Sequence, residues 1–99
     1  MTPEKKVKNE VVKMLKLYKN LYYFYPVMGG YGAAGIPDIV VCYRGYFIAV
    51  ECKAGKGKTT ALQDKNLKQI RDAEGIAIVV NEENLQELQD ILNVILEEE

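Results

Sequence analysis

The sequence predicts an α/β domain in which helices flank one mixed β-sheet. Apolar residues recur at helical spacing in three segments, at residues 3–19, 60–73 and 84–95. Runs of β-branched and aromatic residues, which favour strands, fill residues 21–27, 39–53 and 76–80. The middle run is divided at residues 44–45 and therefore supplies two strands. The expected order is helix, three strands, helix, strand and helix.

The length and composition fit one folded domain that spans residues 1–99. Hydrophobic residues make up 48% of the chain, which argues against disorder. The charges are unevenly distributed, because residues 1–71 hold all 13 lysines and arginines while residues 72–99 hold nine of the 14 acidic residues. This asymmetry indicates a basic working surface and an acidic, solvated end, although a lysine-rich helix face can also serve solubility alone.

The two cysteines, Cys42 and Cys52, both fall in apolar strand segments. If residues 44–45 form a two-residue turn, Cys42 faces Phe47 and not Cys52, so we expect two free thiols. Free thiols fit a reducing, cytoplasmic compartment, and no apolar signal segment begins the sequence. The long uncharged stretch at residues 20–37 contains prolines and glycines and is shorter and less apolar than the about 20-residue span of a membrane helix. We therefore expect no membrane partner.

The first helix is predicted to begin with Thr2 as N-cap and Pro3 in its first turn. Its apolar face comprises Val7, Val11, Met14, Leu15 and Tyr18. At about 100° per residue, Glu4 falls near the middle of this face and Glu10 at its edge. A carboxylate turned toward a core needs a partner. Glu4 therefore either joins an active site or only complements the helix dipole.

The second segment, residues 21–27, is predicted to be a strand that Pro26 either ends or confines to a sheet edge. The glycine-rich loop that follows, at residues 28–36, lacks the lysine and the subsequent helix of a P-loop, so no nucleotide cofactor is expected. Its glycines would allow close approach of another backbone, including that of a nucleic acid. A simple connection remains the alternative.

The hairpin at residues 38–53 carries the strongest chemical signal. With a two-residue turn at Arg44-Gly45, Asp38 lies opposite Glu51, and Lys53 projects from the same face as Glu51. Facing carboxylates repel one another, so two of them beside a lysine indicate a bound cation. An additional residue in the turn would shift this register and separate the two carboxylates.

After a short Gly-Lys loop, Thr60 and Gln63 match a capping box at the start of the second main helix. Its expected inner face comprises Leu62, Leu67, Ile70 and Ala73. Gln63 serves either that cap or an active site. Gly75 ends the helix, and residues 76–80 form a buried strand.

The last helix is expected to be capped by residues 81–84 and to run to a frayed tail at residues 97–99. Its apolar stripe forms either core or a partner surface. The stripe comprises Leu85, Leu88, Ile91, Leu92 and Ile95.

The residues Gly35-Ile36-Pro37-Asp38 and Glu51-Cys52-Lys53, on adjacent strands after a first helix, resemble the PD-(D/E)xK nuclease superfamily. The Gly-Lys loop after Lys53 and the Thr-Ala-Leu-Gln63 helix start are closer still to its VRR-NUC branch. The resemblance covers residues 4–80. It implies a restriction-endonuclease-like fold with an αβββαβ core, a mixed central sheet and, in this chain, an extra C-terminal helix.

The resemblance also implies an active site. Asp38, Glu51 and the main-chain carbonyl of Cys52 would bind Mg²⁺ or Mn²⁺, hard ions that prefer oxygen ligands. Glu4 would bind the metal through water. Because the first-helix carboxylate is variably placed in the superfamily, Glu10 is a reserve candidate.

Two further residues have implied roles. Lys53 would position or help to activate the attacking water and neutralise developing charge, and Gln63 would orient Lys53 or the phosphate. Histidine is absent, so any general base is lysine or a metal-activated water.

Stand-alone VRR-NUC domains of viral and bacterial type resemble dimeric Holliday-junction resolvases. The resemblance thus implies a metal-dependent endonuclease that hydrolyses phosphodiester bonds in branched DNA as a homodimer, because a four-way junction needs two cuts and a two-fold assembly presents two sites. The aromatic strand or the last helix would supply the interface. Two alternatives stay open, namely a restriction-like or exonuclease subunit of a larger complex, and a non-catalytic DNA-binding domain in which Asp38, Glu51 and Lys53 form a structural ion-pair cluster.

Overall fold

The computed structural model describes residues 1–27 and 35–99. Its element order is the one that the sequence predicts. The elements are α1 (Pro3–Leu15), β1 (Leu21–Phe24), β2 (Ile39–Tyr43), β3 (Tyr46–Cys52), α2 (Ala61–Asp72), β4 (Ile76–Val80) and α3 (Leu85–Glu97). The predicted glycine-rich loop lies outside the described residues except for Gly35 and Ile36. No helix of the described part is long and apolar enough to cross a membrane.

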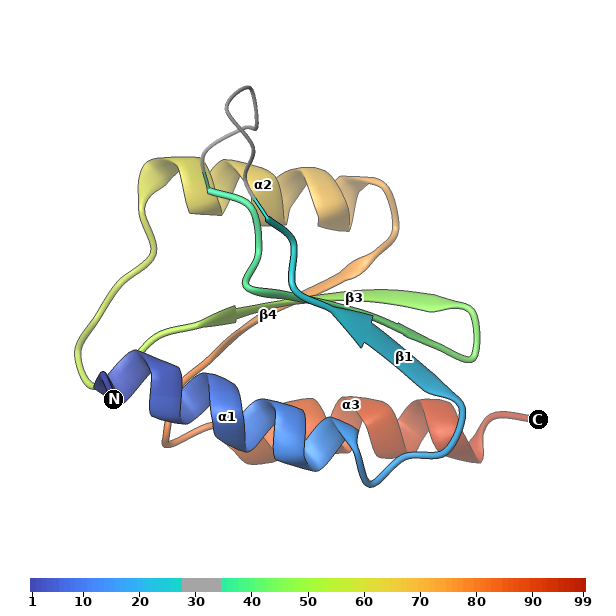
Figure 1. The fold of residues 1–99 in the computed structure, drawn as a ribbon. Coiled ribbons are helices and arrows are strands. Elements are labelled where there is room, and N and C mark those ends of the chain that lie inside the picture. Colours follow the sequence, from blue (N-terminus) through green and yellow to red (C-terminus); the bar gives the residue numbers. More distant parts are fainter. Residues whose placement is uncertain (28–34) are drawn as a thin grey trace.

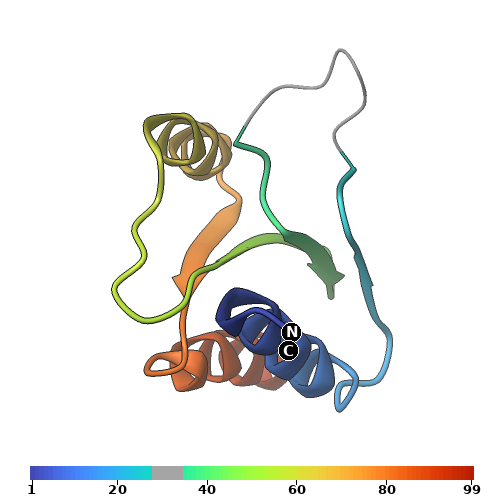
Figure 2. The ribbon, with the colours of Figure 1, turned by 60° about the vertical axis from the view of Figure 1, so that its left-hand side comes forward.

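The four strands form one mixed sheet in the order β1-β2-β3-β4. β1, β2 and β3 are antiparallel neighbours, whereas β4 runs parallel to β3. A parallel pair needs a long crossover, which α2 supplies. α1 and α3 lie side by side on one face of the sheet, and α2 lies on the other face (Figures 1 and 2). The expected restriction-endonuclease-like arrangement, with the extra helix α3, is therefore present.

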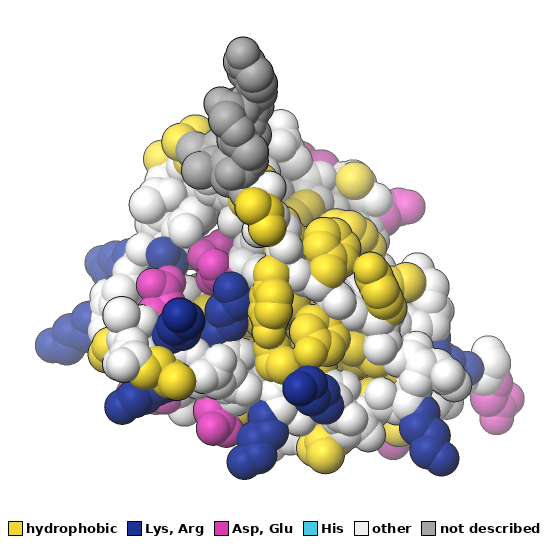
Figure 3. Space-filling model, in the orientation of Figure 1, with side chains coloured by type: hydrophobic (Ala, Val, Ile, Leu, Met, Phe, Trp, Pro, Cys, Tyr) yellow, Lys and Arg dark blue, Asp and Glu magenta, His cyan; other side chains and the backbone are white. Residues whose placement is uncertain are grey.

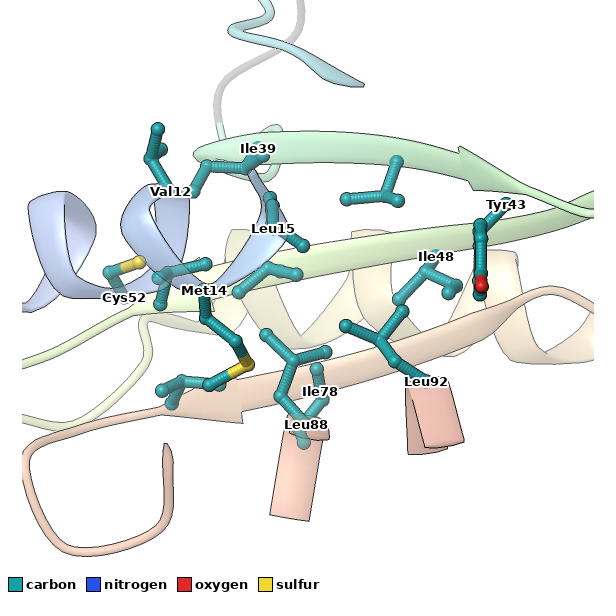
Figure 4. Packing of buried hydrophobic residues seen from close by; sticks show 14 of the residues in the cluster. Val12, Met14, Leu15, Ile39, Tyr43, Ile48, Cys52, Ile78, Leu88 and Leu92 are labelled. Carbon is teal, nitrogen blue, oxygen red and sulfur yellow. The ribbon is translucent and has the colours of Figure 1, made fainter. Parts of the chain in front are cut away.

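The core lies between the sheet and the layer formed by α1 and α3 (Figure 4). Leu15 of α1, Ile48 of β3 and Leu88 and Leu92 of α3 are almost fully buried there. Leu85 and Ile91 pack against the same cluster. The apolar stripe of the last helix is thus core and not a free partner surface.

Several predicted boundaries were wrong. α1 ends at Leu15 and not at Lys19, because the chain must turn back into β1, and Asn20 takes a positive φ of 60° to do so. β1 ends at Phe24, before Pro26, and it is an edge strand as predicted. At the other end of the chain, α3 extends to Glu97, the first residue of the predicted tail, and the Tyr46 hydroxyl donates to the Glu98 carboxylate at 2.6 Å.

Two side-chain expectations also failed. Leu62 and Ala73 of α2 are exposed, so the inner face of this helix is narrower than predicted and centres on Leu67. Asn84 precedes α3 but makes no side-chain cap, because its amide is engaged elsewhere. Its Oδ1 accepts from Asn81 N–H, and its Nδ2 donates to the Val79 carbonyl. Asn84 therefore fixes the loop between β4 and α3.

The hairpin register is the predicted one. Arg44 and Gly45 have φ values of 49° and 86°, as a two-residue turn of type I′ requires, and Tyr43 pairs with Tyr46. The ladder continues without a bulge to the pair Ile39 and Val50. Asp38 and Glu51 follow directly, at the end of the hairpin that is remote from the turn.

Candidate metal centre

Asp38 precedes the first residue of β2, and a hydrogen bond fixes its carboxylate. The Cys52 N–H donates to Asp38 Oδ2 at 2.8 Å. This contact joins the start of β2 to the end of β3, just beyond Ile39 and Val50, the last backbone pair between these two strands. It places Asp38 beside Glu51, so the sequence-derived proximity holds, although Asp38 itself lies outside the strand.

Gly35 allows α2 to approach this end of the sheet. Its φ is +82°, and a Cβ at this position would lie 2.5 Å from the Leu62 carbonyl carbon and 2.7 Å from the Gln63 nitrogen. Only glycine fits such a backbone-to-backbone contact without displacement. The segment that leads into Asp38 therefore passes directly against the first turn of α2, which carries Gln63.

Gln63 forms the predicted cap and also contacts the acidic cluster, so the two alternatives of the sequence analysis do not exclude one another; a role in catalysis stays a prediction. Its Oε1 accepts from Thr60 N–H at 2.9 Å, and its own N–H donates to Thr60 Oγ1, which completes the capping box. Its Nε2 donates to Glu51 Oε1 at 3.1 Å. Because the cap fixes the side chain, the amide is held in place to orient the Glu51 carboxylate.

Glu51 is the buried charged residue of the described structure, with 1% of its surface exposed. Its Oε2 is buried and has no hydrogen-bond partner among the described residues. The pKa of Glu51 is raised from 4.5 to about 8, first by burial and then by the adjacent Asp38 carboxylate, which favours a proton shared between the two groups and repels the ionised form, and the nearby Lys53 only partly opposes this. A buried carboxylate oxygen without a partner is costly, and a cation bound beside it would remove that cost.

Glu4 completes an acidic cluster with Asp38 and Glu51. Each of these residues offers a carboxylate oxygen, and the three oxygens lie within 4.8 Å of one another. Glu4 does not point into the core as its helical phase suggested, because the first turn of α1 projects past the core to the end of the sheet. Its Oε1 lies 3.8 Å from Lys53 Nζ, and the Lys53 side chain is 15% exposed.

The reserve candidate Glu10 lies elsewhere. It is exposed and lines a pocket with Glu82 and Leu85, between α1 and the start of α3. It is not part of the acidic cluster. Of the two carboxylates on α1, the structure therefore selects Glu4.

Cys42 and Cys52 are both free thiols, as predicted. Burial, together with the Asp38 and Glu51 charges, raises the pKa of the Cys52 thiol to about 12. The thiol therefore stays protonated at neutral pH and is a poor metal ligand. A role for Cys52 in metal binding would have to come from its main-chain carbonyl, which stays a prediction.

The donor set fits a hard divalent cation. Carboxylate oxygens are the ligands that Mg²⁺, Mn²⁺ and Ca²⁺ prefer, and no thiolate or imidazole accompanies them. A cation at this point would give Glu51 Oε2 a partner and would lower the pKa of Glu51 toward its ordinary value. The chemistry of the cluster thus accommodates the metal that the sequence analysis expected, although it does not select one ion.

Comparison with solved structures supports the fold. The chain aligns with a protein described as a "VRR_NUC domain protein" at a TM-score of 0.69, over 96% of this chain and 86% of that one, with 19% sequence identity. The fold is that of a VRR_NUC domain. No protein-family model and no curated protein matches the sequence. At this level of identity the match shows the fold alone, and within that fold the chain carries an acidic cluster that could hold a metal ion.

The uneven charges of the sequence predict a basic surface but do not place lysines of α1 at the acidic cluster. A pocket of about 190 Å³ over the acidic cluster is lined by Thr2, Glu4, Lys5, Lys8, Asp38 and Cys52. Figure 3 shows Lys and Arg side chains beside Asp and Glu side chains on this face of the molecule. Glu4 and Lys8 are four residues apart on one helix, and this spacing was the available signal that they share a face.

Proposed function

We propose that this chain is a divalent-metal-dependent DNA endonuclease that cuts four-way junctions as a homodimer. The observation that carries the proposal is the buried, unpartnered Glu51 oxygen in a cluster with Asp38 and Glu4 beside Lys53. An isolated carboxylate oxygen of this kind is destabilising in a purely structural role. It is useful where a cation and a substrate must bind.

Glu4, Asp38 and Glu51 are the residues that would hold the metal. Bound there, Mg²⁺ or Mn²⁺ would polarise the scissile phosphate and lower the pKa of a water molecule. The chain's own groups prepare the site. Gln63 holds one oxygen of Glu51, and the Cys52 N–H holds one oxygen of Asp38, so that both carboxylates are oriented before substrate arrives.

Lys53 is the proposed partner of the reacting phosphate. Its ammonium lies at the edge of the cluster, 3.8 Å from Glu4, and is largely shielded from solvent. A shielded positive charge stabilises the negative charge that develops on a phosphate more strongly than an exposed one does. The same ammonium can position the attacking water.

The dimer is proposed from the substrate, since two symmetric cuts in a four-way junction need two equivalent sites. The apolar stripe of α3 is buried, so of the two interface candidates β1 is the better supported. Tyr22 and Phe24 of this edge strand are 66% and 45% exposed. Sedimentation analysis or light scattering measures the oligomeric state directly, and a monomer at the concentrations that support cutting would contradict the dimer.

The enzymatic proposal is tested with Lys53→Met and the control Lys65→Met, which removes an exposed lysine from α2. Each protein is incubated with end-labelled four-way junction, linear duplex and closed circular DNA, with Mg²⁺, with Mn²⁺ or with chelator. We expect metal-dependent cutting that favours the junction, a loss of about 10²–10³-fold in Lys53→Met, and little change in Lys65→Met.

Each other outcome excludes one part of the proposal. Cleavage by Lys53→Met at the wild-type rate would exclude the proposed mechanism. Equal cutting of junction and linear DNA would exclude the junction preference, and degradation that requires free ends would favour an exonuclease. DNA binding without cutting in either metal would favour a non-catalytic domain.

A further inference from the structure

Lys8 differs from the other lysines of α1. Lys5, Lys6 and Lys13 of this helix are exposed, whereas Lys8 is half-buried. A lysine on a helix surface ordinarily extends into water, where its ammonium is hydrated. The partial burial of Lys8 therefore needs a local cause, and the surrounding structure supplies one.

The Lys8 ammonium lies over an aromatic ring. Its Nζ is 4.4 Å from the centroid of the Tyr25 ring, which is a cation–π distance. Tyr25 in turn packs edge-to-face against Tyr23 of β1, with the ring centroids 6.0 Å apart. The Tyr25 ring, itself supported by Tyr23 of the edge strand β1, thus holds the position of the ammonium.

The same ammonium faces the pocket above the acidic cluster. Lys8 lines that pocket together with Asp38 and Cys52, and its charge acts on the Cys52 thiol at the base of the pocket. The ion pairs among the described residues are Lys53 with Glu4 and Lys68 with Asp72, so Lys8 forms none in this part of the chain. Lys8 is therefore a positive charge that the Tyr25 ring holds beside the acidic cluster.

We propose that Lys8, held by the Tyr25 ring, binds a backbone phosphate of the DNA strand next to the phosphate that occupies the metal centre. The inference rests on the proposed nuclease function and specifies how the strand lies across the site. Lys53 and Lys8 then stand on two sides of the acidic cluster, one for the reacting phosphate and one for its neighbour. Lys8 is a binding residue for the sugar–phosphate backbone, and Tyr25 is a positioning residue that acts through Lys8.

The chemistry favours a phosphate over other occupants of the pocket. A hydrated ammonium on a flexible stem loses freedom when it binds an anion, and a ring that holds it beforehand reduces that loss. The three acidic residues repel any anion, whether a peptide carboxylate or a phosphate, until a cation neutralises them, and a single peptide carboxylate can occupy only one of the two positions, the metal or Lys8. A DNA strand whose neighbouring phosphate is bound by the metal brings the second anion to Lys8 without that repulsion, because the cation neutralises the cluster.

The experiment measures DNA binding without cleavage. Fluorescence anisotropy of a labelled four-way junction and of a labelled linear duplex is recorded for wild type, Lys8→Met, Lys8→Arg and Lys13→Met, with Ca²⁺ in place of Mg²⁺ or Mn²⁺ so that the acidic cluster is neutralised, and gel analysis of the same samples checks that the DNA stays uncut. Methionine keeps the length and apolar contact of the stem and removes the charge. Lys13 is the matched control because it is an exposed lysine further along the same helix.

We expect Lys8→Met to bind both DNAs about tenfold more weakly and to lower the slope of log affinity against log salt by about one phosphate contact. Lys8→Arg should recover most of the affinity, and Lys13→Met should change it little. If Lys8→Met binds no more weakly than Lys13→Met, or if its salt slope equals that of wild type, Lys8 does not bind phosphate.

Tyr25 is tested by a double-mutant cycle. Tyr25→Phe keeps the ring and should bind DNA as wild type does, whereas Tyr25→Leu should weaken binding about threefold. In the Lys8→Met background, Tyr25→Leu should have no further effect, because the tyrosine acts through the lysine. An additive loss in the double variant would instead mean that Tyr25 contacts DNA by itself and would refute the positioning role.

Metal titration separates this role from a merely structural one. Lys8→Met removes a positive charge beside the acidic cluster, so it should bind Mn²⁺ as tightly as wild type does or slightly more tightly. Calorimetry measures this affinity. Weaker Mn²⁺ binding, or a thermal midpoint well below that of Lys13→Met, would show that Lys8 supports the fold. If wild type binds DNA but cuts none, the nuclease proposal fails, yet the Lys8→Met affinity still decides the phosphate contact.

Discussion

The two ends of the β2–β3 hairpin differ in whether their polar groups have hydrogen-bond partners. At the turn, Arg44 Nη1 donates to the Ile95 and Leu96 carbonyls at 3.0 and 2.7 Å, and Tyr46 donates to Glu98. These bonds satisfy the last carbonyls of α3 and join the turn to the helix end. At the open end, Glu51 Oε2 is buried without a partner in the described structure, and the pKa of Glu51 is raised to about 8.

One end of the hairpin therefore contributes to the stability of the fold, and the other end carries the proposed functional site. Polar groups at the turn are paired, so that end contributes to folding. At the open end Glu51 is oriented by Gln63 but is buried beside Asp38, so its ionisation costs stability in the metal-free protein, and the cluster leaves a place for a cation. If this interpretation is correct, substitutions at the two ends should have opposite effects on stability and activity.

The largest expected effect is that of Glu51→Gln on cleavage. Glutamine keeps the size of the side chain and can accept the bond from Gln63 Nε2, but it removes the charge that a divalent cation needs. We expect cutting to fall by about 10³-fold, which corresponds to about 4 kcal/mol. Urea unfolding of the metal-free variant at pH 7 should show stability equal to or above that of wild type. A large loss of stability would mean that Glu51 has a structural role.

The second effect is a pH dependence of metal-free stability. Because the folded-state pKa of Glu51 is raised from 4.5 to about 8, the folded protein binds this proton more tightly than the unfolded chain does. The associated stability is complete below about pH 4.5 and is lost as pH rises toward 8, by at most about 1.4 kcal/mol per pH unit.

Urea unfolding at pH 5 and pH 8 checks this trend, with Glu51→Gln as the reference that cancels the other titrating groups. The loss toward pH 8 should be absent in Glu51→Gln. Added Mn²⁺ should restore the stability of the wild type most strongly at pH 8, where the metal no longer competes with the proton. If the free energy of unfolding of the wild type changes between pH 5 and pH 8 only as much as that of Glu51→Gln, the pKa of Glu51 is not raised in the folded protein.

The smallest effect is that of Arg44→Asn at the turn. Asparagine suits the positive φ of 49° and forms good type I′ turns before glycine, so the backbone should keep its shape. The variant loses both bonds to the end of α3, and we expect a destabilisation of about 1 kcal/mol. The cleavage rate of the folded protein should not change. A cleavage defect with full stability would mean that the two ends of the hairpin are coupled.

Local patterns were enough to predict much of this molecule. The alternation around Arg44-Gly45 set the register, because a two-residue turn leaves one pairing that buries a consistent face. Thr2-Pro3 and Thr60–Gln63 marked two helix starts, since capping depends on residues close in sequence. Helix ends and the exposure of Leu62 escaped prediction, because they depend on where the chain must turn and on what covers each face.

The sequence by itself determined the element order, the hairpin and the pairing of Asp38 with Glu51 at its open end. These features follow from periodicity and turn chemistry, which act over a few residues. Only the tertiary structure decided that Glu4 and not Glu10 joins the cluster, that Gln63 both caps α2 and holds Glu51, and that Lys8 lies over Tyr25. Those contacts join separate elements, and their distances depend on how α1 and α2 pack on the two faces of the sheet. Helical phase alone does not specify that packing.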